Sequence, residues 1–392
     1  MPYKVDRQFR RVPWLTIAVI AVNVLVFGAT IGNLKSVVQA FGFHMDANGL
    51  LYGWLTAMFL HGGISHIGGN MFFLWLFGSY VEDVLGWRAW VVTYLVGGFA
   101  AAVTYGIFTA LFDMEHVRIP AIGASGALAA IMGLFVVRFY RTKIKFALCW
   151  PFFPIWKWRT FTWTSLVAIG LWFSREVGEA ILFGGGDGVA HWAHIGGLLF
   201  GAAVGMLSGQ REEADIECLT DEAVEAELVG NHALAAAKYD RMLEHTPTDA
   251  EALYGRARVE MQGGNALQAA EDLRQFAELV VREGRQERLV LALDELRGQL
   301  AAVPLDARTL GALASAAESR RRPDLASEQY WRVVQEFPTS REAERGLFRL
   351  AHIYVDAGME HEARETWKRF LNAFPNSEWV AYAQPILREG AA

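Results

Sequence analysis

Long apolar runs occupy the first 207 residues, and they constrain the fold more than any other feature of this chain. A helix needs about 20 apolar residues to cross a bilayer, because in lipid its backbone groups must be hydrogen-bonded internally. Six runs are near this length: roughly 12–30, 66–85, 89–112, 125–139, 163–182 and 189–207. We therefore expect an all-α membrane domain of six transmembrane helices over residues 1–210.

The charge balance reverses where the last apolar run ends. Residues up to Arg211 carry 15 Lys and Arg against 9 Asp and Glu, whereas the remainder carries 21 against 33. A chain that is 53% apolar and 20% charged is too apolar for an ordinary soluble protein. The composition predicts two domains, a membrane domain over 1–210 and a soluble helical domain over 211–392.

Basic residues indicate the orientation, because Lys and Arg near span ends stay in the cytoplasm. The basic clusters before the first run, between the second and third, between the fourth and fifth, and after the sixth all fall on one side. We expect an integral protein of the bacterial inner membrane, with the N-terminus and the acidic domain cytoplasmic. Cys149 and Cys218 are the only cysteines, and a disulfide framework is not expected.

A small-residue turn, Gly123-Ala124-Ser125-Gly126, opens the fourth run. A serine flanked by small residues at a helix start exposes its hydroxyl beside the positive end of the helix. This arrangement suits a nucleophile whose product is an oxyanion. The alternative is a packing motif, since Gly, Ala and Ser let apolar helices approach closely in lipid. Residues elsewhere in the chain favour the first interpretation.

Two polar residues share one face of the second run. His66 and Asn70 are four residues apart, so they lie on the same side of a helix. Polar groups inside a membrane are costly and are functional candidates for that reason, although a structural role is open for each alone. Asn23 in the first run is expected to make an interhelical hydrogen bond. Glu82 and Asp83 are expected to form interfacial ion pairs with Arg88 and Arg138.

The sixth run places a histidine before a stripe of glycines. Gly197, Gly201 and Gly205 would line one helix face and admit the small face of the fourth run, formed by Gly126, Ala130 and Gly133. This packing would bring His194 level with Ser125, as a base beside a nucleophile. His191 is expected to be structural. Residues 184–188, Gly-Gly-Gly-Asp-Gly, form either a flexible hinge or a tight connection.

These motifs together resemble the rhomboid intramembrane serine proteases over roughly residues 10–208. The resemblance rests on HxxxN in the second span, GxSG opening the fourth and AHxxGxxxG in the sixth. It implies a dyad of Ser125 as nucleophile and His194 as base, with an oxyanion hole formed by His66, Asn70 and the Ser125 amide. It also implies close helix packing at Gly123, Gly126, Gly197 and Gly201, structural roles for His61 and Glu82, and no metal or cofactor.

Two positions depart from the family pattern. Tyr52-Gly53 replaces a Trp-Arg pair of the first external loop, and Ala129 replaces an aromatic that stacks on the catalytic histidine in many members. No carboxylate is expected to orient His194, as suits a dyad.

The acidic domain contains a helical repeat. Gly230, Ala235 and Tyr239 recur 34 residues later as Gly264, Ala269 and Leu273, the period of tetratricopeptide repeats. A second pair of repeats follows late in the chain with an offset about three residues longer, and the stretch 280–304 is irregular. The repeats predict a concave surface for a cytoplasmic protein or peptide, or a purely architectural cap.

The sequence therefore predicts an intramembrane serine endopeptidase with a partner-binding repeat domain. Its expected partners are single-span or other transmembrane substrates, membrane lipid and a cytoplasmic protein, without nucleic acid. The alternative is a catalytically inactive rhomboid-like scaffold, for which buried polar groups at these positions would have no use. A channel or transporter is a weaker third hypothesis, because the runs show no inverted repeats.

Overall fold

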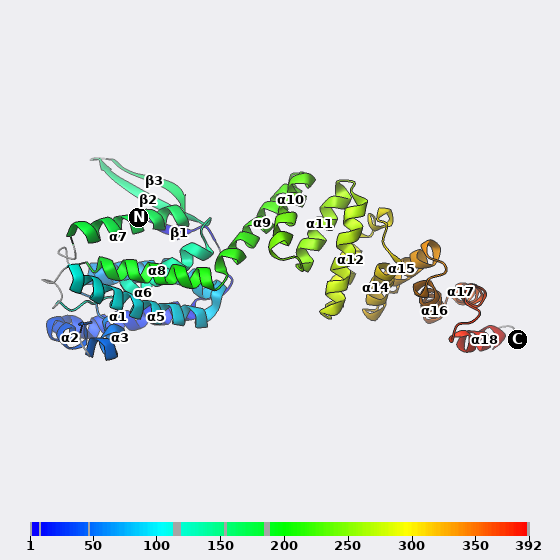
Figure 1. Cartoon of the computed structure of the whole chain (residues 1–392), viewed down its shortest axis with the longest axis horizontal. Helices are drawn as coiled ribbons and strands as arrows, with labels where there is room; N and C mark the ends of the chain where they lie inside the picture. The colour runs from blue at the N-terminus through cyan, green and yellow to red at the C-terminus, as the bar shows by residue number, and fades with distance from the viewer. Residues whose placement is uncertain are drawn as a thin grey trace. The chain divides into compact units, whose positions relative to one another are not determined.

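The computed structural model describes residues 2–7, 9–45, 48–112, 119–152, 155–183 and 189–389. The glycine-rich stretch 184–188, predicted as a hinge or connection, lies outside this set. Packing divides the chain into two units, Met1–Asp215 and Ile216–Ala392, close to the boundary predicted after residue 210. Each unit is described by itself below (Figure 1).

The first unit is mostly helical, and each predicted apolar run lies largely in helix. Its main helices are α1 (Trp14–Thr30), α2 (Leu34–Phe41), α4 (Ile64–Phe73), α5 (Ser79–Phe112), α6 (Ser125–Arg138), α7 (Ser165–Phe183), α8 (His191–Leu207) and the start of α9 (Gln210–Leu228). Shorter turns are η1 (Ile31–Asn33), η2 (Gly49–Gly53), α3 (Trp54–Ala57) and η3 (Leu74–Gly78). Tyr52 and Gly53, where the sequence departs from the family pattern, lie in η2.

Fewer helices than six meet the length and hydropathy expected of a membrane span. Within the described residues two stretches do, Trp14–Phe41 and Ile64–Phe112, or three if the bent pair α8 and α9 counts as one. The 49-residue stretch Ile64–Phe112 is broken at Gly86, whose φ of 79° is not helical. Two of the predicted runs are therefore the two arms of one kinked stretch, and the count of six spans stays a prediction.

Helix α6 is the centre of the first unit. Twelve of its 14 residues are buried, and α5 and α8 pack against it (Figure 1). At about 1.5 Å per residue it is only about 21 Å long, shorter than the hydrocarbon core of a bilayer. Its first residue therefore lies below the membrane surface if the helix ends near the opposite side.

Glycines allow α6 and α8 to touch along their backbones. A Cβ atom at Gly197 would overlap the carbonyl oxygen of Gly126, and one at Gly201 would overlap that of Ala130. On the other side of the contact, a Cβ at Gly133 would overlap the carbonyl oxygen of Leu198. Close backbone approach through small residues is how apolar helices associate in lipid. The packing fixes the height of α8 along α6.

A three-stranded antiparallel sheet corrects the expectation of an all-α chain. Its strands are β1 (Pro2–Val5), β2 (Lys143–Phe152) and β3 (Ile155–Thr164), in the order β1-β2-β3. Residues 159–164, Arg-Thr-Phe-Thr-Trp-Thr, alternate threonine with bulkier side chains, a pattern that favours a strand. Phe146 and Phe161 face each other across the strands, with ring centroids 5.3 Å apart. Charge counting alone treated this hairpin as a loop.

The acidic pair at the start of α5 binds backbone amides, which corrects the expected ion pairs with Arg88 and Arg138. Glu82 accepts hydrogen bonds from the N–H groups of Leu15 and Thr16 at 2.8 and 2.7 Å. Asp83 accepts from the N–H groups that precede α1, at Arg10 and Arg11. The first amides of a helix have no partner within it, so a carboxylate there satisfies them. Asn23 donates to the Val19 carbonyl of its own helix, and its side chain also interacts with Tyr94 of α5.

The second unit is a series of helical hairpins that follows α9 (Figure 1). Its helices are α10 (His232–His245), α11 (Ala250–Gln262), α12 (Ala266–Arg282), α13 (Gln286–Leu296), α14 (Ala307–Ser319), α15 (Pro323–Glu336), α16 (Arg341–Asp356), α17 (Glu360–Ala373) and α18 (Val380–Glu389), with the 3-10 turn η4 (Leu300–Ala302). One continuous apolar core joins these helices. The stretch predicted to be irregular contains α13 and η4.

Left-handed residues mark five of the turns between consecutive helices. Gly230, Gly264, Gly284 and Gly358 have φ of 72°, 84°, 70° and 72° at the turns before α10, α12, α13 and α17. The turn before α15 has Arg321 instead, with φ 57°, the one non-glycine residue of positive φ in the described part of the chain. Glycine adopts this region without strain, whereas a residue with a Cβ atom does not. The hairpin of α14 and α15 therefore keeps the geometry of the repeat without its glycine.

Arg321→Gly should stabilise the second unit. Glycine removes the strain of the left-handed conformation in the folded state, and it also increases the conformational entropy of the unfolded chain. Because the first effect should be larger, the free energy of unfolding should rise by about 0.5–1 kcal/mol. Urea unfolding of residues 216–392 followed by circular dichroism measures this. As a matched control, Gly358→Ala should lower it, since a Cβ there meets no atom within 4 Å and only the backbone is strained. An unchanged or lower stability in Arg321→Gly would contradict the argument.

Candidate active site

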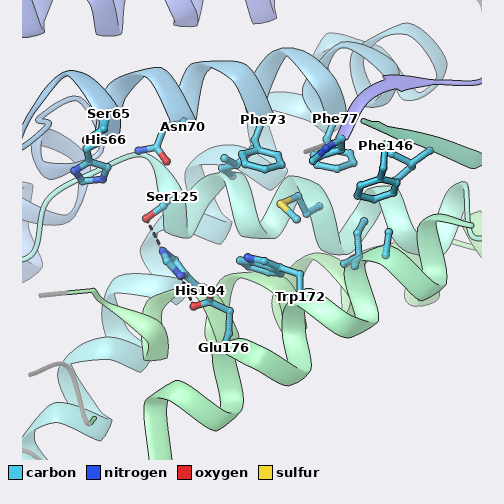
Figure 2. Close-up of a pocket in the computed structure, with 17 residues that line it drawn as sticks. Ser65, His66, Asn70, Phe73, Phe77, Ser125, Phe146, Trp172, Glu176 and His194 are labelled. Atoms are coloured by element: carbon cyan, nitrogen blue, oxygen red, sulfur yellow. Dashed lines mark hydrogen bonds and ion pairs between the residues drawn. The ribbon is translucent and has the colours of Figure 1, made fainter. Parts of the chain in front are cut away.

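Ser125 is the first residue of α6 and lies half-buried at the end of a cavity (Figure 2). Gly123 precedes the helix with φ 119°, a conformation that turns the chain sharply into its first turn. No side chain of the described residues caps the helix, so the amides of its first turn have no capping acceptor among them. The hydroxyl and amide of Ser125 are thus placed at the positive end of α6.

His194 is the base candidate, and it lies in the first turn of α8. Its Nε2 atom is 2.8 Å from the Ser125 Oγ atom, a hydrogen-bonding distance. The glycine contacts between α6 and α8 hold the two residues at the same height. The structure thus brings together the serine and histidine that the sequence paired.

Two side chains of α4 face the same space from the other side (Figure 2). The Gly62 N–H donates to His66 Nδ1 at 3.3 Å, so Nδ1 is an acceptor and the ring proton is on Nε2. The Asn70 Nδ2 atom is buried and has no hydrogen-bond partner among the described residues. A Cβ atom at Gly123 would lie 2.7 Å from His66 Nε2 and 3.6 Å from Asn70 Nδ2. Glycine at this position keeps the space in front of both donors open.

A carboxylate orients His194, which corrects the expectation that none would. Glu176 on α7 places its Oε2 atom 2.7 Å from His194 Nδ1 and 2.8 Å from His191 Nδ1. The Glu176 side chain is only 3% exposed. The sequence analysis did not single out Glu176, although it lies inside the predicted fifth run. An acidic residue inside an apolar run is itself the signal that could have found it.

An aromatic ring from α7 also packs on His194. The rings of Trp172 and His194 have centroids 5.9 Å apart. Trp172 and Glu176 are four residues apart and therefore share a face of α7. Ala129, where the family pattern has an aromatic, is buried on α6 and lies near Gly197 of α8. The ring support that α6 lacks is supplied by α7.

The cavity that reaches Ser125 is apolar along most of its length. It has a volume of about 400 Å³ and lies between α4, α6 and α7. Phe73, Phe77, Met132, Ile169 and Trp172 line it, and the polar residues gather at the serine end (Figure 2). His61 is fully buried, and its ring packs edge-on against His66 at 5.1 Å. The site combines an apolar cavity with a hydrogen-bonded serine and histidine and two side-chain donors.

Known proteins resemble both units. A family profile described as Rhomboid domain matches residues 48–211, and one described as Tetratricopeptide repeat matches 345–377. RHOMBOID-like protein 6, mitochondrial, of Arabidopsis thaliana is 32% identical over 39% of this chain and 42% of its own length. Presenilin-associated rhomboid-like protein, mitochondrial, of Homo sapiens is 27% identical over 47% and 45%. This chain thus spans less than half the length of these relatives.

A solved structure of a thermophilic TPR protein from Thermus thermophilus covers 44% of this chain and 98% of its own length. Its identity to this chain is 20% and its TM-score is 0.23.

The fold and the site define a helical membrane protein with a serine and a histidine at hydrogen-bonding distance. With the matching profiles, this helical membrane protein contains a Rhomboid domain at residues 48–211 and a C-terminal tetratricopeptide repeat at residues 345–377. It is distantly related to rhomboid proteases, among them Rhomboid-type serine protease 2 of Emericella nidulans at 26% identity.

Gly201→Val should reduce activity far more than stability. The added side chain would force α8 away from the Ala130 carbonyl and lengthen the distance between Ser125 and His194. A displacement of about 1 Å can cost about 10²-fold in rate. Labelling of Ser125 by a fluorophosphonate probe measures the loss, and thermal unfolding in detergent measures stability. Gly28→Val on α1, where a Cβ meets no atom within 4 Å, is the control. Full activity of Gly201→Val would refute the packing argument.

Proposed function

We propose that this protein is an intramembrane serine endopeptidase that cleaves transmembrane segments of other membrane proteins. The observation that carries the proposal is the 2.8 Å contact between Ser125 Oγ and His194 Nε2, opposite an Asn70 amide that has no partner among the described residues. In this proposal the first unit crosses the membrane six times. The N-terminus and the repeat unit lie in the cytoplasm, and the membrane is the bacterial inner membrane.

The first chemical step uses the serine and the histidine as a pair. Ser125 Oγ attacks the carbonyl carbon of the scissile peptide while His194 Nε2 takes the hydroxyl proton. The carbonyl oxygen becomes an oxyanion, and the donors facing it are His66 Nε2, Asn70 Nδ2 and the Ser125 amide. Collapse of the intermediate expels the amine, which receives the proton from His194. Water then attacks the acyl-enzyme by the same proton transfers and releases the acid.

The apolar cavity supports a membrane segment as substrate. Its lining by phenylalanine, methionine and isoleucine side chains would accept apolar residues, whereas the polar groups meet only the scissile peptide. A helical peptide bond has its carbonyl hydrogen-bonded, so the segment must unwind before attack. We therefore expect substrates with Gly, Pro or polar residues near the cleavage site.

The rival hypothesis is a rhomboid-like scaffold without activity. It leaves the buried Asn70 amide unexplained, because an unpaired buried donor costs about 1–3 kcal/mol and binding alone would not need it. In an enzyme, the Asn70 amide gains a hydrogen-bond acceptor when the oxyanion of the intermediate forms. This difference favours the protease.

Asn70→Ala should slow turnover without weakening substrate binding. Loss of one oxyanion donor should raise the barrier by about 2–4 kcal/mol and leave KM nearly unchanged. The measurement is cleavage of labelled single-span substrates by the purified protein, with Ser125→Ala as the inactive control. If the wild-type protein cleaves no member of a broad panel, the scaffold hypothesis is favoured. A variant with lost binding and normal turnover would refute the oxyanion assignment.

The repeat unit should influence substrate choice and leave the chemistry intact. A chain ending at Glu217 keeps the hydrogen bond from Tyr140 to Asp215 and the whole first unit. It should cleave an unstable transmembrane segment at the wild-type rate, and lose the preference for substrates with cytoplasmic tails that bind the repeats. Competition between tailed and tail-less substrates measures this. A truncated chain that folds but cleaves nothing would contradict the separation of roles.

A further inference from the structure

Glu176 contacts the base from the side opposite the nucleophile (Figure 2). Building on the proposed protease function, we infer that Glu176 is a positioning residue that turns the pair of Ser125 and His194 into a relay of three residues. Its oxygen accepts the Nδ1 proton of His194, and the other ring nitrogen is left to face Ser125.

The hydrogen bond selects the tautomer that catalysis needs. A neutral imidazole carries one proton, and a carboxylate can only accept hydrogen bonds. His194 Nδ1 lies 2.7 Å from Glu176 Oε2 and carries the ring proton. The lone pair of Nε2 therefore points to the serine hydroxyl. In the other tautomer Nε2 would carry a proton and could not take one from Ser125. Glu176 therefore acts on the first chemical step through His194.

Its charge stabilises the state that follows. Once His194 has taken the serine proton, the ring is a cation beside a carboxylate with 3% exposure. Attraction between opposite charges is strong where water is excluded. The charges of the cation and of the oxyanion appear together in this step, so a fixed negative group behind the ring favours the intermediate over the starting state.

His191 holds the carboxylate in place. It is buried and donates its Nδ1 proton to the same oxygen of Glu176 at 2.8 Å, one turn before His194 on α8. Two donors from one helix fix the position of the oxygen better than one. Trp172 packs on the His194 ring from the same helix as Glu176. Two residues of α7 therefore hold the His194 ring: Trp172 packs against it, and Glu176 accepts its Nδ1 proton.

The same three groups could instead bind a metal ion, and the experiment must separate the two cases. The ligand atoms of Glu176, His191 and His194 lie within 4.8 Å of one another, and two histidines with a glutamate suit zinc. A metal on His194 Nδ1 would leave the proton on Nε2. Activity that requires a metal is therefore incompatible with the positioning role.

The test measures the full-length protein in detergent with Glu176→Gln, Glu176→Asp and the matched control Glu179→Gln. Glu179 is a second carboxylate of α7, paired with Arg175 at 3.1 Å, and its Oε2 atom lies at the longer distance of 3.9 Å from His191 Nδ1. We expect Glu176→Gln to lower kcat and the rate of fluorophosphonate labelling about 10²-fold, with KM nearly unchanged. Glu176→Asp, which keeps the charge, should recover part of the loss. Glu179→Gln should behave as the wild-type protein.

Several results would overturn the inference. If Glu176→Gln has the kcat of the wild-type protein, or if Glu176→Gln and His191→Gln lower kcat equally, Glu176 has only a structural role in the packing of α7 against α8. Loss of wild-type activity on adding a chelator would assign the cluster to a metal. If Glu176→Gln does not fold, Glu176→Asp is compared with Glu176→Ala. A folded Glu176→Asp whose kcat is no higher than that of Glu176→Ala would contradict the role of the charge. Failure of the proposed function is separate, since it appears as an inactive wild-type protein.

Discussion

The contact between the backbones of α6 and α8 is the constraint on which the site depends. Side chains usually keep helix axes apart, but glycine at 197 and 201 lets the carbonyl groups of α6 lie directly against α8. A serine at the start of one helix and a histidine in the first turn of the other then meet without a flexible loop between them. Reacting groups on rigid elements keep their separation within the narrow range that proton transfer tolerates. Substitutions along this seam are therefore expected to change the separation of Ser125 and His194.

Sequence analysis predicted the residues of this seam because their signals are local. A glycine every four residues, a serine between small residues and a histidine one turn before the stripe can each be read from spacing alone. Glu176 could not be found in that way, because its partner is defined by how α7 lies against α8, and spacing along the chain does not reveal that contact. The same holds for Trp172, which takes the place that Ala129 leaves vacant beside His194.

The remaining differences have similar physical origins. The sequence analysis left residues 143–162 as a loop and began the fifth apolar run at 163, although alternation of threonine with aromatic residues in 159–164 favours a strand. Glu82 and Asp83 were matched to basic side chains, whereas the unpaired amides at the start of α1 are the nearer and more numerous donors. Pairing charged side chains by sequence position ignores backbone N–H groups, so it could not predict these hydrogen bonds. In the repeat unit, the 34-residue period indicated where turns lie. It did not predict that Arg321 would adopt, at one turn, the left-handed conformation usual for glycine.

Helix α7 contributes both to the wall of the cavity and to the support of His194. Ile169 and Trp172 form a wall of the apolar cavity, and Glu176, one turn further along, holds the base. Any shift of α7 relative to α8 would therefore alter the cavity wall and the support of His194 together, because both depend on the same face of one helix.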